Sequence, residues 1–166
     1  MNLASLVQQL EQIEQNKISK FCKIIDEYNE IAIIGNGGSN AIASHISQDY
    51  TKKLGKKAFC FSDPSRLTCY INDYGMEKAY AQYLSEFCSN DCLVILISSS
   101  GESANILRCA EYCLENGIEY IILTGFKSNN TLREMYGAKS ELEMWIDSGC
   151  YGVVECAHQS FLHTPC

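Results

Sequence analysis

Apolar residues near the start of the chain recur at three- and four-residue intervals. They are Leu3, Leu6, Val7, Leu10 and Ile13, followed by Ile18, Phe21, Ile24 and Ile25. This period is typical of an amphipathic helix, and it predicts one long or broken helix that extends to about Tyr28. Such a helix needs a partner surface to cover its apolar stripe.

Four short, nearly continuous apolar runs follow, at residues 31–35, 57–62, 92–98 and 120–125, and segments with helical periodicity lie between them at 39–54, 75–87 and 103–116. Continuous apolar strands indicate burial on both faces, as in a parallel sheet covered by helices on either side. Alternating residues at 141–147 predict a fifth strand at an edge, and residues 150–163 predict a closing helix. We therefore expect a single α/β domain over residues 1–166: a doubly wound parallel sheet of about five strands, with an N-terminal helix over 1–28 and an α/β core over 30–163.

Composition narrows the function classes. The formal charge is −7, which disfavours binding of nucleic acid, because non-specific binders of the phosphate backbone use clustered Lys and Arg. No apolar run approaches the roughly 20 residues of a membrane span, and the first residues do not resemble a secretory signal. We expect a soluble cytoplasmic protein with no membrane partner.

The ten cysteines form no C-x-x-C pair and are expected to be reduced thiols. The i, i+4 spacing of Cys88 with Cys92 and of Cys109 with Cys113 leaves a metal site open as the alternative.

Two loops at the ends of predicted strands carry the candidate chemistry. In open α/β sheets, ligands bind beyond the carboxyl ends of the strands. The loop "GNGGSN" at 35–40 follows the first strand, and its glycines permit close approach of the backbone to a ligand. The loop "SSSGES" at 98–103 leads into a helix whose first N–H groups favour an anion. These features predict a phosphate site in the second loop, although a serine-rich turn that only caps a helix has the same composition.

Nucleotide motifs fit the first loop poorly. The dinucleotide fingerprint G-x-G-x-x-G requires a third glycine where Asn40 stands, and the nearest acidic candidate past the second strand, Asp63, is too far along the chain. A Walker-type loop is excluded because no G-K-[ST] follows.

Two pairs of ionisable residues lie near these loops. His45 and Asp49 are spaced i and i+4 on the helix after the first loop, so both project from one face. Glu155 and His163 are eight apart on the closing helix, about 80° around its axis. Such pairs can share a metal or divide acid and base roles, although each taken alone is also common on a solvated surface. His158 falls on the other side of Glu155, and we interpret it as structural or interfacial.

Four segments in order resemble the sugar isomerase (SIS) domain, and more narrowly the phosphoheptose isomerases. They are "IGNGGSNAIASHISQDYTKK", "FSDPSRLTCYINDYGMEKAYAQYL", "LVILISSSGESANI" and "GIEYIILTG". The resemblance implies aldose–ketose isomerisation of sedoheptulose 7-phosphate through an enediol, and a homo-oligomer, with a homotetramer as the family's form, into which residues 1–28 pack. A non-catalytic sugar-phosphate-binding or protein-adaptor module is the alternative that the same resemblance leaves open.

The resemblance also implies roles for particular residues. Asp49 would be the base and His163 the acid. The phosphorylated sugar would be bound by Asn36, Gly37, Ser39, Lys53, Asp73, Ser98, Ser99, Ser100 and Ser103. A zinc ion would be held by His45, Asp49, Glu155 and His163.

Three residues depart from the family's pattern. Asp49 stands for a longer glutamate, Glu155 for a neutral glutamine, and Gly152 for an aspartate. The chain also ends in "TPC" after His163, where the family's last helix continues. Because Thr164 precedes a proline, we expect the closing helix to stop near His163.

Overall fold

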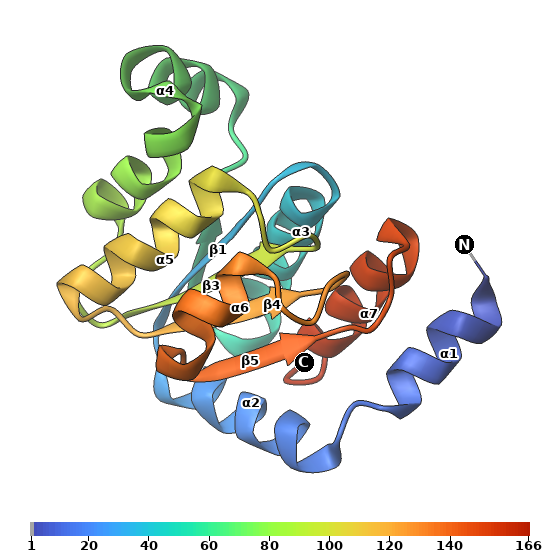
Figure 1. Cartoon of the computed structure of the whole chain (residues 1–166). Helices are drawn as coiled ribbons and strands as arrows, with labels where there is room; N and C mark the ends of the chain where they lie inside the picture. The colour runs from blue at the N-terminus through green and yellow to red at the C-terminus, as the bar shows by residue number, and fades with distance from the viewer. Residues whose placement is uncertain (1) are drawn as a thin grey trace.

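The computed structural model describes residues 2–166, and its centre is a five-stranded parallel sheet (Figure 1). The order across the sheet is β2-β1-β3-β4-β5. The strands are β1 (Glu30–Gly35), β2 (Lys57–Cys60), β3 (Cys92–Ser98), β4 (Tyr120–Thr124) and β5 (Leu142–Trp145). Each neighbouring pair is parallel. The prediction of an α/β fold with about five parallel strands is therefore confirmed.

Helices connect the strands and cover both faces of the sheet. They are α1 (Leu3–Glu11), α2 (Gln15–Glu27), α3 (Gly37–Leu54), α4 (Pro64–Phe87), α5 (Ala104–Asn116), α6 (Thr131–Tyr136) and α7 (Tyr151–Leu162), with a short 3-10 turn η1 (Gly137–Lys139). In Figure 1, α4 and α5 lie on one side of the sheet, and the N-terminal helices lie toward the opposite side with α7.

Two hydrophobic cores result, one on each face. Along β1, Ile31 and Ile33 belong to the core that contains residues of α2, α3 and α7, whereas Ala32 and Ile34 belong to the core under α4, α5 and α6. All four side chains are fully buried. Because successive side chains of a strand point to opposite faces, burial on both faces explains why the strand sequences are continuously apolar.

The N-terminal helix takes the broken form of the predicted long or broken helix, with the break between Glu11 and Gln15. The helix boundaries differ from the predicted ones in two other places. α4 begins at Pro64 rather than near residue 75, because the Asp63 carboxylate caps its first turn by accepting from the Arg66 N–H at 2.9 Å. Gly75, with φ +77°, breaks this helix in the middle. α6 was not predicted, because one and a half turns are too short for a periodic signal.

The end of α7 and the burial of three cysteines agree with the predictions. α7 ends at Leu162 with His163 as its C-cap, as the proline at 165 predicts. Cys92, Cys109 and Cys113 are buried among the apolar residues under α4 and α5, as expected of thiols that act as small hydrophobes. No helix in the described part of the chain combines the length and apolar character needed to cross a bilayer.

Candidate active site

The two predicted ligand loops lie next to each other because β1 and β3 are neighbours in the sheet. After β1 the chain continues to β2, which lies at one edge of the sheet. After β3 it continues to β4 in the opposite direction, so the two connections diverge between β1 and β3. A crevice forms at such a switch point, beyond the carboxyl ends of the strands. A cleft of about 200 Å³ lies there. Its walls are made by Asn36, Gly37, Gly38, Ser39, Ile97, Ser98, Ser99, Ser100, Ser103, Tyr151 and Glu155.

The serine loop forms a compact turn that suits an anion. The Gly101 N–H donates to the hydroxyl of Ser98 at 3.2 Å, and the Glu102 N–H donates to the hydroxyl of Ser100 at 3.2 Å. Ser103 is the N-cap of α5, yet its hydroxyl makes no capping hydrogen bond. The hydroxyl of Ser99 is buried without a partner among residues 2–166. The Ser103 hydroxyl accepts only a long hydrogen bond, from the Ser98 hydroxyl at 3.4 Å. Hydroxyls at the positive end of a helix are the groups that a phosphate needs.

Asn130 fixes the shape of this loop from the neighbouring β4 side. Gly101 has φ +68°, and a Cβ at this position would lie 2.0 Å from the Oδ1 of Asn130. Asn130 is fully buried, donates to the carbonyl of Lys127 at 2.8 Å and accepts from the Arg133 N–H at 3.2 Å. The serine loop therefore requires glycine at 101 for two reasons, its backbone conformation and the close packing of Asn130.

A pair of amides joins the first loop to the helix after the second. The Asn36 side chain donates to Asn105 Oδ1 at 2.9 Å, and the Asn105 side chain donates back to Asn36 Oδ1 at 2.8 Å. Asn105 lies in the first turn of α5 and is 4% exposed. Sequence reasoning selected Asn36 but missed Asn105, because nothing local in the sequence connects positions 69 residues apart.

Glu155 and Tyr151 close the cleft from α7. A Cβ added to Gly38 would lie 2.3 Å from the Oε1 of Glu155, so the glutamate carboxylate sits directly against the backbone of the first loop. Tyr151 is 58% exposed and packs edge-on against Phe126, with ring centroids 4.7 Å apart. A carboxylate repels a phosphate but accepts hydrogen bonds from hydroxyls. Glu155 therefore suits the sugar part of a ligand better than its phosphate.

Asp49 and two histidines converge from different helices. His45 and Asp49 lie on α3, and His163 caps α7. Asp49 Oδ2 is 3.9 Å from His45 Nε2, 3.5 Å from His163 Nδ1 and 2.9 Å from Lys53 Nζ. The two imidazole rings meet edge-on with centroids 5.1 Å apart. The helical spacing predicted the His45–Asp49 pair, and His163, which entered through the family resemblance, is brought to it by the fold.

The charges in this group favour an ionised Asp49 carboxylate beside a neutral His163 imidazole. The hydrogen bond from Lys53 lowers the pKa of Asp49, and burial opposes this effect only in part. The same hydrogen bond raises the pKa of Lys53. Burial lowers the pKa of His163, and the neighbouring His45 lowers it further. At neutral pH, Asp49 can therefore accept a proton and His163 offers a free lone pair.

A buried hydrogen bond holds the two helices together beside this group. The Tyr50 hydroxyl donates to the carbonyl of Leu162 at 2.7 Å, and both residues are fully buried. Tyr50 follows Asp49, and Leu162 precedes His163. The contact therefore fixes the end of α7, although a proline follows two residues after His163. Thr164 adds to this by donating to the carbonyl of Phe161 at 2.8 Å.

The group has the donor set of a metal site. His45, Asp49 and His163 each offer one ligand atom, and these atoms lie within 4.8 Å of one another. Two imidazole nitrogens and a carboxylate oxygen are a common ligand set for Zn²⁺. Glu155, the fourth predicted ligand, is not part of this group, because its carboxylate lies over Gly38 in the cleft.

Within one copy of the chain, Asp73 lies outside both the cleft and the group around Asp49. It lies exposed on the first half of α4, where its carboxylate accepts from the Asn72 amide at 2.8 Å. It is not among the residues that line the cleft between the two loops. In Figure 1, this half of α4 projects beyond the rest of the molecule.

Comparison with known proteins places the chain in a family. A family model described as SIS domain matches residues 2–125. The phosphoheptose isomerase of Fusobacterium nucleatum is 30% identical over 159 residues, which covers 92% of this chain and 79% of that protein. The phosphoheptose isomerase of Sodalis glossinidius is 36% identical over 96 residues, which covers 55% of this chain and 50% of that protein. The match thus spans about half the length of the Sodalis protein and most of the length of the Fusobacterium protein.

The fold is also that of a solved relative. The structure of phosphoheptose isomerase GmhA from Neisseria gonorrhoeae superposes with a TM-score of 0.84 and covers 97% of this chain and 89% of its own. The two sequences are 23% identical. At that identity, the superposition shows the shared fold alone, and any inference about the chemistry must come from the residues of the site.

Proposed function

The chain belongs to the SIS domain family, and on that premise we propose that it is an aldose–ketose isomerase of a phosphorylated sugar, with sedoheptulose 7-phosphate as its substrate. The observation that carries this proposal is the position of Asp49. Its carboxylate lies within 4 Å of two imidazoles and a lysine, on a helix that starts at the serine-lined cleft. Isomerisation moves a proton between C1 and C2, which requires a base and an acid at one end of the substrate.

The phosphate and the reacting carbons would bind at two ends of one surface. Ser98, Ser99, Ser100 and Ser103, at the start of α5, offer hydroxyls to a phosphate. Glu155 lies at this end, and His163 lies eight residues further along α7, about 12 Å by helical rise. A long open-chain sugar phosphate suits that separation. Glu155 and the Asn36 amide would then contact hydroxyl groups between the two ends.

Asp49 is suited to the proton transfer. The Lys53 ammonium keeps the carboxylate ionised at neutral pH, so it can accept the proton from the carbon next to the carbonyl. A neutral His163 can polarise the carbonyl through an N–H or return a proton to it. Each general acid–base step of this type typically contributes about 10² to 10⁴ in rate.

Zinc is the metal that the donor set favours, and we propose His45, Asp49 and His163 as the residues that hold it. Bound there, it would supply Lewis-acid stabilisation of the oxygen that becomes negative. The lowered pKa of His163 keeps the imidazole in the neutral form that metal ligands require.

The experiment is an isomerisation assay in deuterated water. Purified protein with added zinc is incubated with sedoheptulose 7-phosphate, and the sugar is followed by proton NMR. We expect an aldose 7-phosphate to form and deuterium to enter at C1 or C2. Binding of the sugar phosphate is measured in parallel by calorimetry. Binding without product and without deuterium exchange would contradict the isomerase function and support a non-catalytic sugar-phosphate module.

Self-association is a further part of the proposal. Leu3 and Val7 on α1 are 67% and 51% exposed, and Tyr74 and Met76 on the projecting part of α4 are 43% and 51% exposed. Apolar side chains of this size on two separate surfaces favour burial against other copies of the chain. We expect a homotetramer by analytical ultracentrifugation. Replacing Leu3 and Val7 together by Glu should shift it to smaller species.

A further inference from the structure

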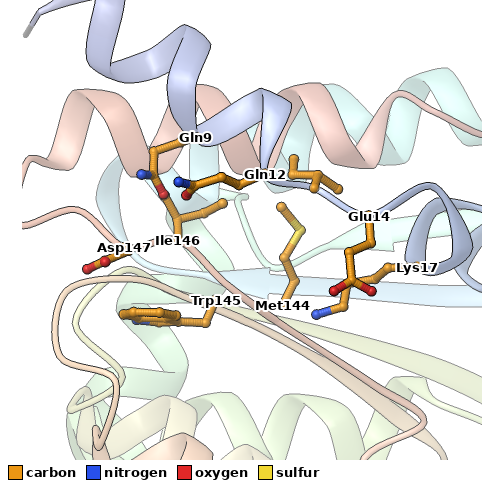
Figure 2. Close-up of a pocket in the computed structure, with 9 residues that line it drawn as sticks. Gln9, Gln12, Glu14, Lys17, Met144, Trp145, Ile146 and Asp147 are labelled. Atoms are coloured by element: carbon orange, nitrogen blue, oxygen red, sulfur yellow. The ribbon is translucent and has the colours of Figure 1, made fainter.

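A second cavity, the amide–indole cavity, lies between the N-terminal helices and the edge strand β5 (Figure 2). It encloses about 200 Å³ and shares no residue with the cleft between the two loops. Its lining residues are Gln9, Gln12, Ile13, Glu14, Lys17, Met144, Trp145, Ile146 and Asp147. The size suits a single small molecule of about the volume of a monosaccharide.

Gln9 is the first sign that this cavity is built for a ligand. Its residue as a whole is 8% exposed, and it lines the cavity without a side-chain hydrogen bond to another residue of the range 2–166. In Figure 2 the side chains of Gln9 on α1 and of Gln12, the C-cap of α1, extend toward Ile146 and Asp147. The donor and acceptor groups of this amide are therefore free to pair with a molecule in the cavity.

Trp145 forms another wall and limits the charge of a ligand. The guanidinium of Arg133 lies 5.1 Å from the centroid of its ring and is held there by an ion pair with Glu143 at 2.5 Å. Because a guanidinium already lies over this ring, the indole is a poorer cation–π partner for a cationic ligand. The Trp145 Nε1 is buried and has no hydrogen-bond partner among the described residues.

The charged groups of the lining disfavour an anion in turn. Glu14 and Asp147 contribute two carboxylates against the single ammonium of Lys17. A phosphate or carboxylate would face net negative charge. A neutral ligand whose hydroxyls both donate and accept can satisfy amides and carboxylates together. The C–H face of a sugar ring also packs well against an aromatic side chain, as in mixed polar and aromatic pockets generally.

We propose that the amide–indole cavity binds a neutral, unphosphorylated sugar of monosaccharide size. Gln9 and Gln12 would hydrogen-bond its hydroxyls, Asp147 would accept from one of them, and the ring would pack against Trp145. This proposal does not depend on the isomerase function, because it concerns a different set of residues. Ile146 and Asp147 lead directly toward α7, so a ligand here contacts the segment that precedes Glu155 and His163.

The test uses the fluorescence of Trp145, which is the only tryptophan in the chain. Full-length protein is titrated with neutral monosaccharides, namely glucose, galactose and mannose, and binding is checked by saturation-transfer NMR on the sugar. We expect at least one sugar to change the emission in a saturable way. Gln9→Leu should weaken that sugar about tenfold, because it removes hydrogen bonds without changing the size of the side chain much.

Two further variants keep the outcome decisive. Gln8→Leu changes the same residue type at an exposed position of the same helix and should leave the affinity unchanged. Asp147→Asn, on the opposite side of the cavity, should weaken the sugar even if Gln9→Leu fails to fold. The proposal is overturned if no neutral sugar gives a saturable change, or if Gln9→Leu and Asp147→Asn bind as tightly as Gln8→Leu.

Discussion

The two halves of the candidate active site are built in different ways. The cleft between the two loops is held by buried backbone and amide contacts, such as the reciprocal Asn36–Asn105 pair and the packing of Asn130 on Gly101. The Asp49 group is made of side chains on helix surfaces, and His45 and His163 remain 49% and 32% exposed. The comparison indicates that the framework for binding is rigid, whereas the reacting group depends on a few side-chain contacts.

The largest effect is expected where the reacting group is changed and the framework is not. Asp49→Asn keeps the shape of the side chain but removes the base, so turnover should fall by about 10² to 10⁴. Binding of sedoheptulose 7-phosphate, measured by calorimetry, should change little, since Asp49 does not line the cleft. Asp26→Asn, an exposed aspartate on α2, is the control and should retain full turnover. Equal loss of binding and turnover in Asp49→Asn would show that the two halves are not separable.

The framework itself is tested by Gly101→Ala. The new methyl meets Asn130 and the backbone is left in a positive-φ conformation, so we expect a loss of about 2 to 4 kcal/mol in unfolding free energy. Gly55→Ala is the matched control, because Gly55 has φ +69° with open space around its Cβ position. It should lose only about 1 kcal/mol in urea denaturation. Similar losses in both variants would show that the Asn130 contact contributes nothing.

A pH dependence should also originate in the framework. His158 is fully buried, and its Nε2 lies 2.9 Å from the carbonyl of Thr124 at the end of β4. Burial lowers the pKa of His158 from 6.5 to about 4. The unfolded chain therefore binds this proton more readily than the folded protein does. The stabilisation is complete above pH 6.5 and is lost as the pH falls toward 4, by up to about 3 kcal/mol.

The contribution of His158 is measured as a difference between two proteins. Because the pKa of His163 is also lowered, the pH dependence of the unfolding free energy is compared between wild type and His158→Gln. The amide can still donate to Thr124 but does not titrate. We expect the variant to show a flatter curve between pH 4 and 6.5. If the unfolding free energy of the variant changes with pH as steeply as that of the wild type, the pH dependence comes from other groups.

The smallest effect is expected from Asn105→Ala. It removes both hydrogen bonds to Asn36 and leaves that amide free to move, which should weaken binding of the sugar phosphate by about tenfold, or about 1.4 kcal/mol. Asn116→Ala, at the other end of α5, is the control and should bind normally. If the two variants bind equally well, the amide pair does not position the first loop.

The sequence was informative about the sheet and less so about the contacts between loops. Continuous apolar runs marked the strands, because burial on both faces leaves a local signal. The i, i+4 spacing of His45 and Asp49 is also a local signal, because it places both side chains on one face of a helix. Asn105, Asn130 and Tyr50 act through partners that are distant along the chain, and no local pattern shows such partners.

The metal ligand set illustrates the same limit. Glu155 and His163 enter the ligand set through the family resemblance, and their spacing of eight residues brings them near one face of a helix. The same eight residues separate them along the helix axis by about 12 Å, and the structure places Glu155 in the cleft and His163 beside Asp49. The assignment of Glu155 as a zinc ligand remains a prediction, as do the roles of Asp73 and Lys53 in binding the sugar.

The central claim is that one sugar phosphate spans both halves of the site. A crystal structure of Asp49→Asn with sedoheptulose 7-phosphate tests it most directly, because the variant lacks the base that would consume the ligand. We expect the phosphate on the serine loop at 98–103, and C1 and C2 within contact distance of residue 49 and His163. A phosphate bound elsewhere, or a sugar whose C1 and C2 point away from residue 49, would contradict the account.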